Sequence, residues 1–140
     1  MIRISPGDMI NPQQLAAAVA GPDGANTLLI FDGQFRSQLN AQNVPFGAPI
    51  KETFSLLLGP QLTRRQFIKA TVTASISKFS FNSFNAQAAG GLWSIEADAD
   101  WDDESGQIEL RVEVSVASGQ MNTTADAFVY AYHVTALAEM

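Results

Sequence analysis

The sequence predicts a mainly β protein, an antiparallel β-sandwich or barrel-like sandwich of about seven strands with one short N-terminal helix. Three observations support this prediction. Apolar and polar residues alternate over several long runs, glycine-containing turn signals separate these runs, and one segment combines helix start and stop signals. A chain of 140 residues suits a single β-rich domain, 1–140, that can bury a proper core.

The expected helix lies in the stretch NPQQLAAAVAGP, residues 11–22. Asn11 can cap it, Pro12 suits its first position, and a Gly-Pro pair can end it. Leu15 and Val19 are four residues apart, so a helix would turn both toward the core. The alanines between them would allow close approach to the element beneath.

The next segments indicate strands and one loop. Residues 26–31, NTLLIF, predict a strand that ends at the turn signal Asp32-Gly33. Residues 34–47 are rich in Asn and Gln and predict an ordered loop. Residues 50–58 alternate like a strand but could also form two helical turns, and we favour the strand.

The second half of the chain has the clearest alternation. Residues 66–77 predict a half-buried strand, and the apolar phase flips at Phe79, which indicates a bulge or a loop. Residues 93–101 and 108–116 predict a hairpin in which Trp101 opposes Ile108. The final run from residue 123 is apolar on both faces, as expected for a central strand or one covered by a partner.

The charge distribution argues against a nucleic-acid or membrane partner. Residues 1–93 carry seven bases and four acids, net +3, whereas residues 94–140 carry ten acids and only Arg111, net −9. Cysteine is absent, which excludes disulfides and thiolate sites. The sequence shows neither an N-terminal signal peptide nor an apolar transmembrane run, so we expect a soluble chain.

The stretch EADADWDDESGQIE, residues 96–109, is the closest approach to a metal motif. The candidate calcium ligands are Asp98, Asp100, Asp102 and Glu109, which take the first, third, fifth and twelfth places of an EF-hand loop. The sixth place holds Asp103 instead of the glycine that such a loop needs. Strand alternation alone also produces this spacing, so we favour a solvated acidic face, no cofactor, and keep Ca²⁺ as the alternative.

Two further candidate sites are a histidine and an aromatic segment. His133 is the only histidine, and we expect a polar surface group, not the general base of a hydrolase; we predict no enzymatic activity. A carbohydrate could stack on the aromatic segment and bond its amides, although core packing is the commoner fate of such rings. The residues concerned are Phe79, Phe81, Phe84, Asn82 and Asn85.

The function we expect is that of a non-enzymatic structural or interaction module that self-associates through its sheet faces. The two-sided final strand, the charge asymmetry and the wealth of Ala, Asn, Gln, Ser and Thr favour a homo-oligomer. We place the interface around Phe128, Tyr130 and Tyr132. Such a module suits a phage particle, a bacterial surface or a scaffold. The alternative is a calcium-dependent or carbohydrate-binding module that uses the acidic hairpin 96–109.

Overall fold

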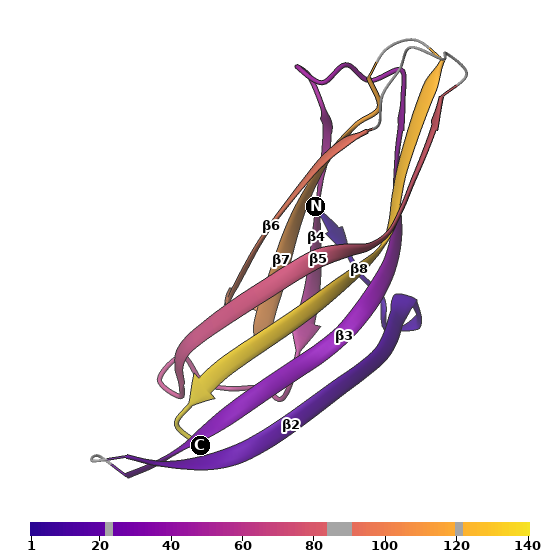
Figure 1. Cartoon of the computed structure of the whole chain (residues 1–140). Helices are drawn as coiled ribbons and strands as arrows, with labels where there is room; N and C mark the ends of the chain where they lie inside the picture. The colour runs from indigo at the N-terminus through magenta and orange to yellow at the C-terminus, as the bar shows by residue number, and fades with distance from the viewer. Residues whose placement is uncertain (22–23, 84–90, 120–121) are drawn as a thin grey trace.

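The computed structural model describes all residues except 22–23, 84–90 and 120–121, and it forms a β-sandwich of two four-stranded sheets (Figure 1). This confirms the predicted fold class. One sheet has the strand order β1-β4-β7-β6 and the other the order β2-β3-β8-β5. All neighbours pair antiparallel except β1 and β4, which are parallel. The strands are β1 (Ile2–Arg3), β2 (Met9–Gly21), β3 (Gly24–Gln42), β4 (Ile50–Leu58), β5 (Phe67–Ser83), β6 (Leu92–Trp101), β7 (Ile108–Ala117) and β8 (Thr123–Ala138).

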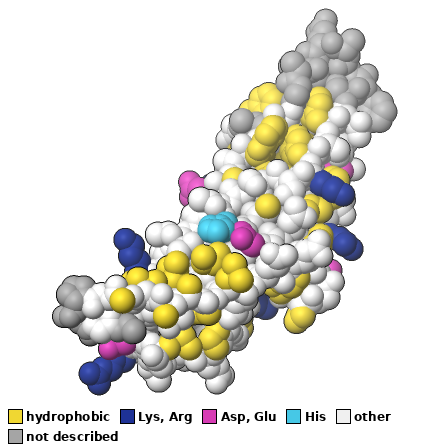
Figure 2. Space-filling view, turned by 60° about the horizontal axis from the view of Figure 1, so that its bottom comes forward, with side chains coloured by type: hydrophobic (Ala, Val, Ile, Leu, Met, Phe, Trp, Pro, Cys, Tyr) yellow, Lys and Arg dark blue, Asp and Glu magenta, His cyan; other side chains and the backbone are white. Residues whose placement is uncertain are grey.

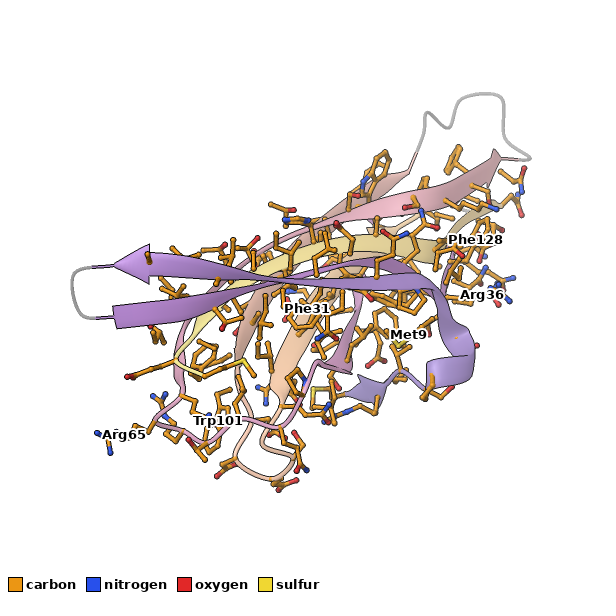
Figure 3. All side chains as sticks on the ribbon, turned by 90° about the horizontal axis from the view of Figure 1, so that it is seen from below. Met9, Phe31, Arg36, Arg65, Trp101 and Phe128 are labelled. Atoms are coloured by element: carbon orange, nitrogen blue, oxygen red, sulfur yellow. The ribbon has the colours of Figure 1, made fainter. Side chains whose placement is uncertain are left out.

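The core lies between the two sheets, where alternate side chains of the inner strands meet. Its centre is a group of aromatic rings: Phe35 stacks on Tyr130 with ring centroids 5.0 Å apart, and Phe54 lies 5.2 Å from Tyr130. Phe31 is buried in the same core and lies near the middle of the molecule (Figure 3). Burial of such rings is a main source of the free energy that holds the sheets together.

The predicted hairpin is confirmed in its register. Trp101 pairs with Ile108, Ala99 with Leu110, and Ala97 with Val112. The turn between β6 and β7 contains Gly106 at φ 71°, a conformation that favours glycine. Residues 50–58 form strand β4, and β8 lies between β3 and β5, so it is a central strand, one of the two placements expected from its two-sided pattern. The expected irregularity near Phe79 is present, since the β5–β8 register shifts on either side of Lys78.

The predicted N-terminal helix is wrong. Residues 9–21 form strand β2, which pairs with β3 in a hairpin, and the only helix in the described part of the chain is the three-residue 3₁₀ turn Pro6–Asp8. Asn11 has φ 48° and lies with Pro12 in a bulge where the β2–β3 register shifts, so it caps nothing. Residues four apart share a face in a strand as well as in a helix, which is why the pattern misled. Helix propensity is weak, and pairing with an apolar neighbouring strand outweighs it.

The predicted turn at Asp32-Gly33 and the loop 34–47 are also wrong over residues 32–42, because β3 continues through them to Gln42. Gly33 is needed for a close approach: a Cβ there would lie 2.6 Å from the Tyr132 hydroxyl oxygen. The glycine therefore makes room for a core tyrosine and does not start a turn. Among the residues that the structure describes, no helix is long and apolar enough to cross a membrane.

Candidate functional site: an open sheet edge and an acidic hollow

Edge strands carry unpaired backbone N–H and C=O groups, and three of the four edges in the described structure have features that hinder pairing with another chain. Strand β1 is only two residues long. Strand β6 carries Glu96, Asp98 and Asp100, and β5 carries Lys69 and Lys78 along with three register shifts. Short length, charges and bulges are the usual protective devices of natural sheets.

Strand β2 is the exception. From Gln13 to Gly21 it pairs with β3 without a break (Figure 1). Over this stretch it contains no charged residue and its side chains are exposed. Leu15 is 67% exposed and Val19 is 41% exposed. A long, unbroken, uncharged edge with exposed aliphatic side chains is a template for pairing with another strand.

Leu15 and Val19 belong to a wider apolar area on the outer face of the β2-β3-β8-β5 sheet. In the register, Leu15 lies beside Ile30, and Leu28 lies beside Leu137, all on the face opposite the buried Val134 and Ala136. We call this area the outer cluster: Leu15, Val19, Leu28, Ile30 and Leu137. Figure 2 shows hydrophobic side chains gathered between the histidine and the tip of the β2–β3 hairpin.

His133 borders the outer cluster and is tied into a short polar chain. Its Nδ1 lies 2.6 Å from Asp32 Oδ1 on β3, and its Nε2 lies 3.1 Å from Thr135 Oγ1. Asp32 can hold the imidazole tautomer that accepts the Thr135 proton at Nε2. Nearly half of the His133 side chain and more than half of the Asp32 side chain are exposed, and the group stands on an open sheet face (Figure 2). This geometry suits a satisfied surface group.

The four predicted calcium ligands line one hollow of about 380 Å³ together with Trp101, Asp103 and Arg111. The two carboxylates of Asp100 and Glu109 are direct neighbours in the β6–β7 register, a like-charge pair. Glu109, which is almost fully buried, is neutralised by protein cations. Arg3 Nη2 lies 2.8 Å from one of its oxygens and Arg111 Nε lies 2.5 Å from the other.

Hydrogen bonds and charge also shift the pKa values of two other side chains that line the hollow, Asp102 and Arg111. The side-chain and backbone hydrogen bonds that Ser105 donates hold the pKa of Asp102 below its usual value. The hydrogen bond to Glu109 and its negative charge raise the pKa of Arg111. In the segments that the structure describes, no three acidic or histidine side chains form a group that could hold a metal ion. Calcium binding stays a prediction, in which Asp98 and Asp100 would have to supply the free oxygens.

The predicted interface residues lie in two different environments. Tyr130 and Tyr132 are 0% and 4% exposed, and burial raises the pKa of both hydroxyls. Their side chains point into the sandwich, so the prediction that they form a sheet-face contact is wrong. Phe128 is half-buried and lies away from the β2–β3 hairpin tip, at the other end of the sheet (Figure 3). The outward residues of a strand alternate with the inward ones, and the two tyrosines are inward.

The predicted aromatic platform is only partly described. Phe84 and Asn85 lie outside the described residues. Phe79 and Phe81 pack against the core, and the Phe79 ring contacts Trp93 at a centroid distance of 4.5 Å. Asn82 is exposed at the same end of β5.

Sequence reasoning missed two parts of the surface. The β2 edge was hidden because its residues were assigned to a helix, although the absence of any charge over residues 9–21 was a visible signal. The ion pair of Glu109 with Arg3 and the contact of His133 with Asp32 join residues about a hundred positions apart, and no local spacing reveals them. Comparisons with protein-family models, curated proteins and solved structures find no match to this chain.

Proposed function

We propose that this protein is a non-enzymatic structural module that assembles with further copies of itself through strand β2 and the outer cluster. One observation supports this most: β2 is the only edge of the described sandwich that is long, uncharged and unbroken over residues 13–21. An edge of this kind gains a full ladder of backbone hydrogen bonds on pairing, and exposed aliphatic side chains add apolar burial.

The proposed surface differs from the one that the sequence suggested. Both surfaces belong to the sheet that contains β8. The sequence suggested a contact at the tyrosines of β8, whereas the proposed contact uses the outward face of this sheet and its edge at β2. Leu137 of β8 takes part because its side chain points outward beside Leu28.

The test is the mass of the assembled protein, measured by light scattering and native mass spectrometry over about a hundredfold concentration range, because dissociation follows mass action. The variant L15K places a charge on the exposed edge, and I68K is its matched control. Ile68 is 47% exposed on β5, the opposite edge of the same sheet. We expect an oligomer for the wild type and I68K and a monomer for L15K. A monomeric wild type, or an L15K oligomer as stable as wild type, would refute the proposal.

A further inference from the structure

We propose that two copies join β2 to β2 in antiparallel orientation about a two-fold axis beside Ala17, so that two four-stranded sheets become one continuous sheet. This inference rests on the proposed function, because it specifies the partner, a second copy of this chain, and the register of the contact. It follows from the length of the open edge, from symmetry and from the side chains that symmetry brings together.

The part of β2 that can pair is bounded at both ends. At its start, the register shift between Ile10 and Gln13 and the missing N–H of Pro12 interrupt the strand. At its end, Gly21 pairs with Gly24 where the hairpin closes. The unbroken segment therefore runs from Gln13 to Gly21, and its midpoint is Ala17.

Symmetry leaves few registers for this segment. A two-fold axis normal to a sheet keeps every residue on its own face, so the axis must pass beside a residue that faces its own copy. The axis beside Ala17 lets the whole segment pair. An axis beside Ala16 or Ala18 leaves residues at one end of each strand unpaired, and the unused N–H and C=O groups weaken the contact.

The register of longest overlap also gives the best side-chain contacts. On the outer face, Leu15 lies opposite Val19 of the second copy, and the symmetry repeats this aliphatic pair on the other side of the axis. Ala17 meets its own copy between the two pairs. On the other face, Ala16 lies opposite Ala18 of the second copy, and these small side chains do not obstruct the approach of the strands. The outer clusters of both copies then form one apolar area.

A symmetric contact between the β2 strands of two copies fits this edge better than a contact between β2 of one copy and a different strand of another copy. The protein has a net charge of −6, which opposes association, but no charge lies on the segment that crosses the axis. A head-to-tail contact would instead pair β2 with the outer edge of β5, which carries Lys69 and Lys78 and shifts register three times. The symmetric contact uses the unprotected edge of both copies and closes as a dimer.

Cysteine substitution tests the register, because the natural chain contains no cysteine. A direct cross-strand pair brings two Cα atoms to about 4.5–5.5 Å, within the range that a disulfide bridges, whereas a diagonal pair lies farther apart than a disulfide usually permits. We expect A17C alone to form a disulfide dimer under mild oxidation. A16C and A18C alone should remain unlinked, and an equal mixture of these two should link. The same variants in denaturant give the background of random linkage.

A charge exchange gives an independent readout that needs no disulfide. Leu15→Lys alone should abolish the dimer, and the double variant L15K/V19E should restore it, since each new ammonium then faces a carboxylate of the second copy. An oligomer in which A17C fails to link and L15K/V19E fails to assemble would overturn this register while the proposed function stands. A wild-type chain that is monomeric throughout would overturn both.

Discussion

Replacement of Tyr130 by alanine distinguishes a core side chain from a subunit contact. The ring is fully buried between Phe35 and Phe54, and its hydroxyl donates a 3.1 Å hydrogen bond to the Ala127 carbonyl oxygen. Truncation of a buried aromatic side chain costs ~3–5 kcal/mol. The lost hydrogen bond contributes ~0.5–1.5 kcal/mol. Since each kcal/mol lowers the melting temperature of a domain of this size by about 4 °C, we expect a fall of about 14–26 °C.

The assay is thermal unfolding followed by circular dichroism at two protein concentrations. Y130F keeps the ring and loses only the hydrogen bond, so we expect a fall of about 4 °C. F128A is the control within the predicted interface, because Phe128 is half-buried and should cost far less than Tyr130. The loss for Y130A should not depend on protein concentration. A loss of less than about 4 °C, or one that grows on dilution, would show that the ring belongs to a subunit contact.

Three further changes probe the acidic hollow and one strained turn. Hydrogen bonds from Ser105 lower the pKa of Asp102 from 3.8, so their stabilisation is present above pH 3.8 and is lost as the pH falls through the lower folded value. S105A should therefore lower the melting temperature more at pH 7 than in strong acid, where the remaining deficit comes from the hydrogen bond that Ser105 Oγ accepts from the Gln107 N–H; an equal deficit at both would contradict this. D100N removes the like charge opposite Glu109 and should leave the melting temperature unchanged or slightly raised, whereas loss of a calcium-dependent rise would support the calcium-binding alternative. Gly59 has φ 74° and a Cβ there would lie 2.7 Å from the buried Phe31 ring, so G59A should lower the denaturation midpoint in urea. An unchanged midpoint would contradict both the backbone cost and the ring contact.

The elements that the sequence predicted best are those in which one period is unambiguous. From residue 93 to residue 116 apolar residues alternate strictly on either side of a turn, and the register of the hairpin followed from that alternation and from the turn. The prediction for the residues of strand β2 was wrong because their pattern does not have one unambiguous period. Leu15 and Val19 are four apart, a spacing that a helix and a strand both satisfy, and only the neighbouring strand β3 decides between them.

For the candidate sites too, the sequence predicted what depends on local alternation and missed what depends on contacts between distant residues. Alternation alone predicted that the carboxylates of β6 share a face, and the structure brings all four predicted ligands to one hollow. Alternation could not predict that Arg3, from a strand at the start of the chain, neutralises Glu109, because that contact depends on the parallel pairing of β1 with β4.

The sequence by itself determined the fold class, the β6–β7 hairpin, the two-sided character of β8 and the acidic face, because each depends on local periodicity and turn chemistry. Only the tertiary structure decided which strands are edges and which faces are covered. Edge and face depend on pairings between residues far apart in the chain, such as β2 with β3 and β3 with β8. The open edge at β2, on which the proposed assembly rests, exists because one side of that strand is paired and the other is not.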